Sequence, residues 1–453
     1  MQGPVARGAT DSAARPQEAR ITEQLQYGDQ LRGGRPLPGA RSALALLFAL
    51  MVVDFVDRQV VVAVFPHLKA AWMLSDAQLG ALVSVISTVI ALASVPLSLL
   101  ADRWGHVKSI FVMALVWSFA TIACAYARDY HELLLARGFV GLGEAAYAPV
   151  GAALLARLFP MRMRATVLGV FLSAAVVGSM LGVALGGVLA ERWGWHAVFG
   201  VVGPPGVLLA IVLLVGMHRH ERPAHPGLTG ASPAPVPVLR AIAAFVESRT
   251  AMVTCIASGL QFATVWAMYA WIPSYLNRFY GVSAARAGAE AAVLVLVGGV
   301  GAVVWSLVAD RMVVRDARAR LHVPAFAALA TGILMLFAFA ALAPGMMQLA
   351  VLLAAGLVMT GSIGPCPAVV IDVVHPAMRA TAAALLAVTG NLLGMAMGPF
   401  VAGALSDAYG LTVALAVMPV FSFIAAAGFV VAARSYVADR DRAGRAGVSF
   451  SYG

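Results

Sequence analysis

The sequence predicts an all-α membrane protein with twelve transmembrane helices arranged as two six-helix bundles. Of its 453 residues, 61% are hydrophobic and 11% are charged, whereas an ordinary soluble domain carries about a quarter charged residues. Apolar runs of about 20 residues recur along the chain, and each is long enough to cross about 30 Å of hydrocarbon as a helix. A basic, proline-rich stretch divides these runs into two sets of six.

Two sets of spans therefore account for most of the chain. The predicted spans cover residues 42–65, 76–100, 109–127, 132–156, 165–189 and 196–217, and then 250–275, 284–309, 322–343, 347–370, 380–404 and 411–434. We interpret residues 1–41 as a disordered cytoplasmic tail, 218–249 as a cytoplasmic linker and 435–453 as a second cytoplasmic tail. Residues 42–217 and 250–434 form the two bundles.

Charge placement orients these spans in the membrane. Most of the 31 Lys and Arg residues fall in the tails, the linker and the loops on their side. This positive-inside asymmetry places both termini in the cytoplasm of a cell whose inner or plasma membrane holds the protein. The net charge of +10 is explained by the Lys and Arg residues on the cytoplasmic side. It is therefore no sign of nucleic-acid binding, and we expect no nucleic-acid partner.

The sequence offers no enzyme site. The three cysteines, Cys124, Cys255 and Cys366, lie inside apolar runs without metal-ligand spacing, so neither a metal nor a cofactor is expected. A phosphate-binding loop with lysine, a His-Glu-x-x-His helix and a nucleophile elbow are all missing from the sequence, which argues against an enzyme and against a primary pump.

The two halves also repeat in sequence. Ser98-Leu99-Leu100-Ala101-Asp102-Arg103 recurs as Ser306-Leu307-Val308-Ala309-Asp310-Arg311, in each case after the second span of its half. Arg164-Ala165-Thr166 recurs as Arg379-Ala380-Thr381 after the fourth. Two markers in the same order and on the same membrane face indicate duplication. Parallel repeats of this kind predict a substrate site at their interface, with rocking between them giving alternating access.

Five ionisable residues lie inside the first and fourth spans: Asp54, Asp57, Arg58, Arg137 and Glu144. A charge at the bilayer centre costs about 3 kcal/mol on insertion scales, so these side chains should face the protein interior. At a rise of about 1.5 Å per residue, Asp57 and Arg137 lie at a similar depth, and we predict that they pair. Glu144 lies two turns deeper on the same helix face and is expected to lack a fixed cation.

The residue types suggest roles for this cluster. Desolvation favours the neutral form of a carboxyl group, so we predict Glu144, together with Asp57, to couple transport to protons. Arg58 and Arg137 are predicted to bind an anionic headgroup, since a guanidinium engages phosphate or carboxylate oxygens in pairs, while Asp57 holds one of the two. The alternatives are a permanently paired, structural Glu144 and two purely structural arginines.

The C-terminal half has no comparable acid-base cluster. We expect five further residues to complete the substrate site: Tyr147, Gln261, Trp266, Tyr269 and Asn391. A cavity with charges on one wall and apolar and aromatic groups on the other suits an amphipathic molecule with an acidic head. The alternative for the aromatic residues is packing or interfacial anchoring, which is commoner in membrane helices.

The loop after the second span reads Asp102-Arg103-Trp104-Gly105-His106-Val107-Lys108. Charges at a cytoplasmic helix end can form ion pairs and interact with a helix terminus, which favours one conformation. The predicted conformational latch comprises Asp102, Arg103, Gly105, Lys108, Asp310 and Arg311; alternatively, these charges only follow the positive-inside rule. The loop resembles the signature loop of the major facilitator superfamily, with Ser98 in place of the family's leading glycine and His106 at a basic position.

A subgroup resemblance rests on three further motifs. Arg137-Gly138-Phe139-Val140-Gly141-Leu142-Gly143-Glu144-Ala145 matches the family's pattern in the fourth span; with Asp57-Arg58 and Trp193-Gly194-Trp195-His196 it resembles the spinster-like subgroup. The superfamily resemblance covers about residues 42–434, and the subgroup resemblance mostly the N-terminal half. It implies the major facilitator fold, a monomer, and proton-coupled secondary transport of a lysolipid-type amphipathic anion.

Two other functions stay open at this stage. The first is an organic-anion/proton symporter of the anion-cation symporter type, which also uses Asp-Arg chemistry in its first span. The second is a non-transporting receptor with a transporter fold. In the fifth span, Gly178, Gly182, Gly186 and Gly187 form a stripe that predicts close helix packing. The family's antiporters end this segment with Gly-Pro, so antiport is unsupported.

Overall fold

The computed structural model describes residues 36–37, 39–217, 248–375 and 378–449. All of its regular structure in these ranges is helical, which confirms the predicted fold class. Most of the predicted N-terminal tail and of the linker, 1–35 and 218–247, lies outside the described residues. Among the described residues, the first helix begins at Ala40, two residues before the predicted span.

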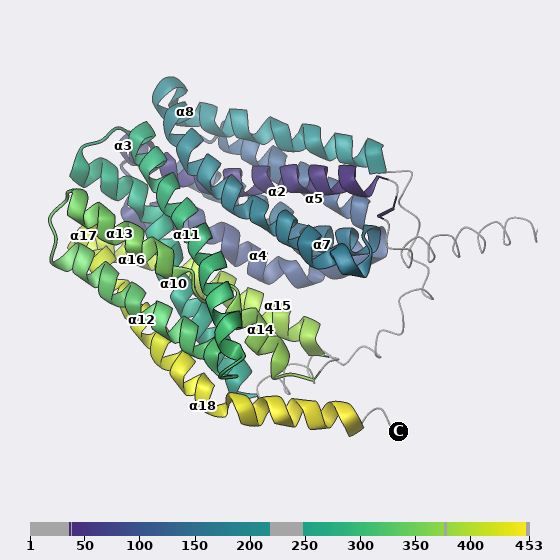
Figure 1. Cartoon of the computed structure of the whole chain (residues 1–453). Helices are drawn as coiled ribbons and strands as arrows, with labels where there is room; N and C mark the ends of the chain where they lie inside the picture. Colours follow the sequence, from purple (N-terminus) through teal and green to yellow (C-terminus); the bar gives the residue numbers. More distant parts are fainter. Residues whose placement is uncertain (1–35, 38, 218–247, 376–377, 450–453) are drawn as a thin grey trace, which may run out of the picture.

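The N-terminal half folds into one bundle and the C-terminal half into another (Figure 1). The N-terminal bundle consists of α2 (Ala40–Ala63), α3 (Phe65–Trp72), α4 (Asp76–Trp104), α5 (His106–Cys124), α6 (Tyr130–Glu144), α7 (Tyr147–Leu158) and α8 (Met161–Met217). The C-terminal bundle consists of α10 (Arg249–Tyr280), α11 (Ala284–Val313), α12 (Ala319–Ala340), α13 (Met346–Met359), α14 (Pro365–Asp372), α15 (Arg379–Thr389), η3 (Gly390–Ala396), α16 (Met397–Tyr409), α17 (Leu411–Val417) and α18 (Pro419–Ser449).

These helices are consistent with twelve spans once the interrupted ones are joined. The fourth span of each half is broken, between α6 and α7 and between α13 and α14. The long helix α8 contains two spans that meet at Gly194, whose φ of 80° is a conformation that glycine adopts without strain. In the described part of the chain, nine helices are long and apolar enough to cross a membrane. Helix α2 is not one of the nine, since Asp54, Asp57 and Arg58 lie in it.

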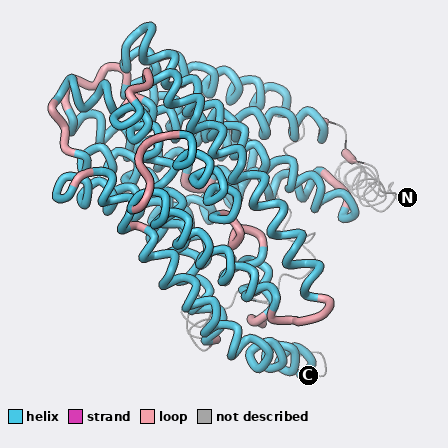
Figure 2. Tube along the Cα trace, turned by 60° about the vertical axis from the view of Figure 1, so that its left-hand side comes forward, coloured by secondary structure: helices cyan, strands magenta, loops and turns pink. Residues whose placement is uncertain are grey.

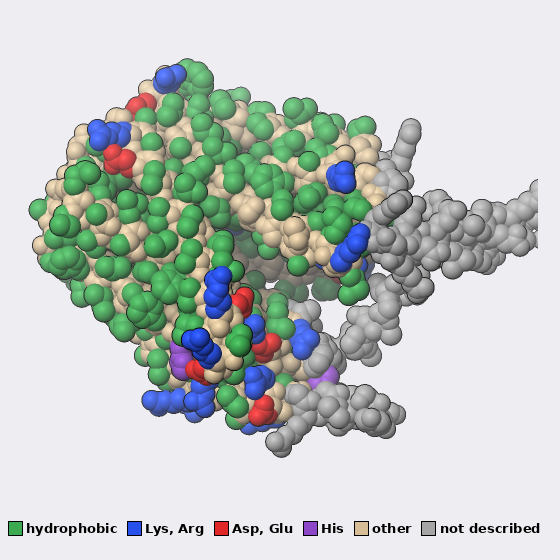
Figure 3. Space-filling view, in the orientation of Figure 1, with side chains coloured by type: hydrophobic (Ala, Val, Ile, Leu, Met, Phe, Trp, Pro, Cys, Tyr) green, Lys and Arg blue, Asp and Glu red, His purple; other side chains and the backbone are tan. Residues whose placement is uncertain are grey.

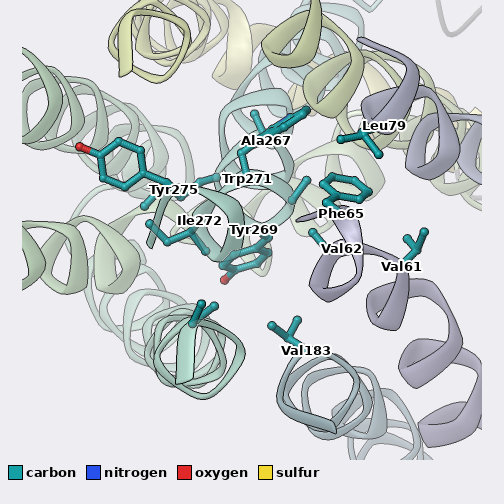
Figure 4. Packing of buried hydrophobic residues seen from close by; sticks show 14 of the residues in the cluster. Val61, Val62, Phe65, Leu79, Val183, Ala267, Tyr269, Trp271, Ile272 and Tyr275 are labelled. Carbon is teal, nitrogen blue, oxygen red and sulfur yellow. The ribbon is translucent and has the colours of Figure 1, made fainter. Parts of the chain in front are cut away.

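The two bundles touch at one end and separate at the other. We call the end with the turns before α4, α6 and α11 the closed end, and the end where α2 begins the open end (Figures 1 and 2). At the closed end, apolar side chains of both bundles share one core that includes Val62, Phe65, Val183, Tyr269 and Trp271 (Figure 4). Figure 3 shows a hollow between the bundles toward the open end.

Within the N-terminal bundle, α8 packs closely against α2 through the predicted glycine stripe. A Cβ added at Gly178 would lie 2.5 Å from the Val52 carbonyl oxygen, and one at Gly182 would lie 2.7 Å from that of Val56. At Gly186 the nearest atom is the Ala63 Cβ, at 2.9 Å. The backbones of the two helices therefore approach one another without intervening side chains, as the small-residue spacing predicted.

We expect Gly182→Ala to destabilise the protein by about 1–3 kcal/mol, because the new methyl group must displace the α2 backbone. Gly169→Ala is the matched control on the same helix, since a Cβ there has nothing within 4 Å. Thermal unfolding of the two variants in detergent measures the difference. Equal midpoints would show that the close contact between α2 and α8 contributes little.

Candidate functional site

Arg137 of α6 and Asp57 of α2 form a buried ion pair. Arg137 Nη1 lies 3.2 Å from Asp57 Oδ1 and also donates to the Asp57 carbonyl oxygen at 3.1 Å. Its Nη2 and Nε donate to the carbonyl oxygens of Arg58 at 3.4 Å and Leu82 at 3.5 Å. Thr121 of α5 donates to the other Asp57 carboxylate oxygen. The pairing predicted from equal depth is confirmed, and it leaves the Arg137 side chain fully buried.

Arg58 lies beside this pair and contacts two further carboxylates. Its Nη2 is 3.3 Å from Asp54 Oδ2, one helical turn away on α2, and its Nε is 3.0 Å from Glu144 Oε2. Its guanidinium also lies 4.9 Å from the centre of the Phe55 ring. The expectation that Glu144 lacks a cation was therefore wrong. Backbone depth places Glu144 about 10 Å from Arg137 along the helix, but the long Arg58 side chain extends back toward it.

The Arg58–Glu144 contact is an ion pair without good hydrogen-bond geometry. The Glu144 carboxylate accepts no well-formed hydrogen bond from an N–H or O–H group of the described residues, and the Asp54 carboxyl group lies within hydrogen-bonding reach of it. Glu144 is also the last residue of α6, directly before the break that leads into α7. A buried carboxylate normally accepts several hydrogen bonds, so one ion pair is a weakly satisfied environment for a full negative charge.

Exposure distinguishes the five charged residues. The Arg58 side chain is 15% exposed, whereas the other four side chains are at most 2% exposed. Three carboxylates face two guanidiniums, so the cluster carries one excess negative charge when every group is ionised. A proton on one carboxylate would bring the net charge of the cluster to zero. Because Arg58 is the most exposed of the five side chains, it is the one that a small molecule could reach.

The other predicted substrate residues lie in different surroundings. Tyr147 is buried and donates its hydroxyl to the Leu47 carbonyl oxygen at 2.6 Å. Gln261 is buried inside the C-terminal bundle, where its Nε2 donates to the Met359 carbonyl oxygen at 2.9 Å. In this conformation both side chains are engaged within their own bundle. A role in direct substrate contact would require them to become exposed.

The remaining three belong to α10 and the π-helical segment η3. Trp266 is half-buried and packs edge-on against Tyr269, with ring centres 5.9 Å apart. Asn391 is half-buried and donates to the Ala387 carbonyl oxygen one turn earlier, at 2.9 Å. These residues do not contact the charged cluster directly in the described interactions. Trp266 and Asn391 are accessible enough to meet a ligand.

The predicted latch residues lie at the open end, at the α4–α5 junction of the N-terminal bundle and near the end of α11 in the C-terminal bundle. Asp102 is 71% exposed and lies 4.0 Å from His106 Nε2, while Arg103 and Lys108 are exposed. Gly105 has a φ of 97°, which a side chain would strain.

The second group of latch residues, near the end of α11, belongs to the C-terminal bundle. Asp310 lies 3.5 Å from Arg320, which also pairs with Asp372 at 2.7 Å, and Arg311 is exposed. The ion pairs of Asp102 and Asp310 that the structure describes each stay within one bundle.

Two residues that contact these charges were given no role from the sequence. Asp54 was counted in the cluster without a partner, although it precedes Arg58 by four residues and such pairs meet on one helix face. Thr121 had no such signal, since a single threonine in an apolar helix is usually bonded to its own backbone. It does contact the Trp117 carbonyl oxygen at 2.9 Å as well as Asp57.

Comparisons with known proteins agree with this architecture. The sequence profile described as Major Facilitator Superfamily matches residues 47–399. The sphingosine-1-phosphate transporter SPNS2 of Mus musculus is 27% identical over 80% of this chain and 69% of its own. The probable L-galactonate transporter of Escherichia coli is 26% identical over 60% of this chain, and the match spans 62% of that protein.

The fold is also that of a solved structure. A bacterial homologue of the human lysosomal transporter Spinster, in an inward-facing and unoccupied conformation, superposes with a TM-score of 0.80. The two chains are 23% identical, and the match covers 89% of this chain and 98% of the other.

Proposed function

Because the chain belongs to the Major Facilitator Superfamily and is spinster-like, a family of transporters and not of enzymes, we propose that it is a proton-coupled secondary transporter of a small amphipathic or lipid-like organic anion. It works by alternating access between the two bundles. With both termini in the cytoplasm, the open end faces the cytoplasm and the protein acts as a monomer in the inner or plasma membrane. Its partners are the substrate, protons and the bilayer.

One observation carries the proposal: two carboxylates, Asp54 and Glu144, share the guanidinium of Arg58, which is the most exposed side chain of the charged cluster. An anionic substrate that binds Arg58 competes with Glu144 for the same cation. Glu144 then takes up a proton, because its buried carboxylate has lost its paired cation. Anion binding and protonation therefore favour each other, as the linkage between two sites requires.

Arg137 and Asp57 have a different part in this scheme. Their buried pair fixes α6 against α2 and holds the Arg58 backbone through the bond from Arg137 Nη2. Arg58 is therefore the residue that binds the acidic head. We propose that the half-buried Trp266 and Asn391 of the C-terminal bundle offer apolar and polar contacts to the rest of the substrate.

We also propose that the two groups of charged residues at the open end, at the α4–α5 junction and near the end of α11, act as a latch when the cleft closes. Asp102 and Asp310 keep their partners within one bundle here, while Arg103 and Arg311 are exposed. Closure of the open end would bring these cations toward carboxylates and helix ends of the other bundle.

The substrate test uses purified protein and a series of anionic lysolipids of increasing chain length. Burial of each methylene contributes about 0.8 kcal/mol, so affinity should rise about fourfold per methylene until the chain leaves the cleft. Arg58→Ala should abolish the ligand-induced rise in melting temperature, and Arg58→Lys should retain part of it because the positive charge remains. Arg286→Ala, at an exposed pair with Glu290, is the control.

A second candidate is a proton symporter for a sugar acid. The relatives named as L-galactonate and D-galactonate transporters favour it. Such a protein should bind a hexonate through Arg58 and show no dependence on chain length. Counterflow in proteoliposomes separates both transporters from a receptor, since a receptor would bind the anion without any exchange of labelled substrate.

A further inference from the structure

The closed end is built from two pairs of segments that repeat between the halves. Helix α4 begins with Ser75-Asp76-Ala77-Gln78-Leu79-Gly80, and α11 begins with Ser283-Ala284-Ala285-Arg286-Ala287-Gly288. Both follow the pattern Ser-x-Ala-x-x-Gly. The segment Gly187-Val188-Leu189-Ala190-Glu191 of α8 matches Gly403-Ala404-Leu405-Ser406-Asp407 of α16, with the pattern Gly-x-Leu-x-acid. Each half therefore contributes one helix start and one acidic segment.

The acidic residue of each bundle binds the helix start of the other bundle. Asp407 accepts the backbone N–H groups of Asp76 at 2.7 Å and Ala77 at 2.8 Å. Glu191 accepts the N–H of Ala285 at 2.9 Å. The first N–H groups of a helix have no partner inside it, and the helix dipole makes this end positive. The two carboxylates are therefore reciprocal caps that cross the interface between the bundles.

Serine side chains cap the same two helices, α4 and α11, at a different N–H group. Ser75 Oγ accepts the N–H of Gln78 at 3.2 Å, and Ser283 Oγ accepts that of Arg286 at 3.3 Å. Each serine thus satisfies the third residue of its own helix. The first or second N–H group is left for the carboxylate of the opposite bundle.

Glycines allow the backbones to approach closely enough for these bonds. An added Cβ at Gly403 would lie 2.3 Å from the Asp76 carbonyl oxygen, and one at Gly187 would lie 2.4 Å from that of Ala284. The other two glycines repeat the relation: a Cβ at Gly80 or Gly288 would lie 2.5 Å from a carbonyl oxygen of the opposite bundle. Any side chain at these four positions would separate the bundles.

The α4–α16 contact has further support. The Asp76 carboxylate pairs with Arg278 of the C-terminal bundle at 2.6 Å, with Lys69 at 2.5 Å, and accepts from Ser406 at 2.5 Å. Phe65 and Trp271, one from each bundle, pack against each other with ring centres 5.3 Å apart (Figure 4). Ala284 stands at the corresponding position of α11, so the α8–α11 contact lacks this carboxylate.

We propose that the two reciprocal caps form a second latch, separate from the predicted latch at the open end, and that this closed-end latch holds the closed end shut. Glu191 and Asp407 provide this latch, and the closed end opens when both release their helix starts. The inference rests on the proposed alternating access. The inference goes beyond alternating access because it names the contacts that stabilise the closed state. These contacts are backbone caps across the interface, and the duplication of the halves provides one in each direction.

Spin labels at Tyr126→Cys and Met346→Cys report the state of the closed end, since both residues are highly exposed there, one on each bundle. The full-length chain is used in lipid nanodiscs, with Cys124, Cys255 and Cys366 replaced by alanine. A hydrogen bond to a charged group contributes about 1.5–3 kcal/mol, so Glu191→Ala with Asp407→Ala should raise the ratio of open to closed populations by at least about tenfold. The measurement needs neither substrate nor flux, so it stands apart from the transport assays.

Two controls define the result. Glu132→Ala removes a closed-end carboxylate that accepts the Arg128 N–H at 2.8 Å within its own bundle, and it should leave the distance distribution unchanged. Gly403→Ala should shift the distribution in the same direction as the double variant, whereas Gly169→Ala should not. An unchanged distribution in the double variant, or an equal shift in Glu132→Ala, would overturn the latch.

Discussion

Glu144→Gln is expected to bind the substrate tightly at every pH and to lose proton-driven accumulation. In the wild-type protein, Glu144 occupies Arg58 when it is ionised, so lowering the pH frees this guanidinium and raises the affinity for an anion. Coupling between two sites is typically worth about 5- to 150-fold in affinity, and we expect a pH effect in this range. Glutamine imitates the protonated form, so the variant should show the low-pH affinity throughout.

The measurement pairs substrate binding across pH 5–8 with uptake into proteoliposomes. A proton gradient should no longer drive accumulation in Glu144→Gln, while counterflow without a gradient continues. Asp54→Asn tests the second carboxylate on Arg58, and Glu132→Gln, outside the cluster, is the control. If Glu144→Gln kept wild-type pH dependence and accumulation, Glu144 would be a structural residue and the coupling scheme would fail.

Arg137→Ala is expected to cause the largest loss of stability. Its removal takes the salt-bridge partner from the buried Asp57 carboxylate and one donor from each of three backbone carbonyl oxygens. Breaking a buried pair by removing one partner typically costs about 3–5 kcal/mol, whereas an exposed pair contributes about 0–1 kcal/mol. Thermal unfolding in detergent should show this difference between Arg137→Ala and the exposed Arg286→Ala.

A second substitution separates charge from packing. Adding Asp57→Asn to Arg137→Ala removes the uncompensated charge, so part of the lost stability should return. No recovery would mean that packing of the arginine side chain, and not its pairing with Asp57, stabilises α2 against α6. A wild-type melting temperature in Arg137→Ala itself would contradict the assignment of this pair as structural.

The apolar runs predicted the helices well because lipid offers no hydrogen-bond partners to the backbone. Every backbone polar group must be bonded within the span, so a run of about 20 apolar residues has few alternatives to a helix. The glycine stripe and the Asp57–Arg137 pair were predictable for a related reason. Helical rise and spacing fix the depth and face of each residue before the bundle is assembled.

The contact between Arg58 and Glu144 could not be predicted from backbone depth. Counting backbone depth separated Glu144 from the cations, but an arginine side chain reaches across a helical turn, and only the packed bundle shows which way it extends. Gln261 gives the opposite case. Its polar side chain in an apolar helix suggested a substrate contact, whereas the packing of α10 against the broken fourth span buries it on the Met359 carbonyl.

The sequence alone predicted a helical membrane protein of duplicated, twelve-span design with a charged cluster confined to its first half, and the described helices are consistent with that design. Tertiary structure decided which charges pair, which arginine a ligand can reach and which end is shut. The physical reason is that Asp407 and Glu191 bind backbone N–H groups, which every residue except proline carries, so the sequence does not show which of these groups a distant carboxylate will bind. Such contacts exist only after two distant segments have been brought together.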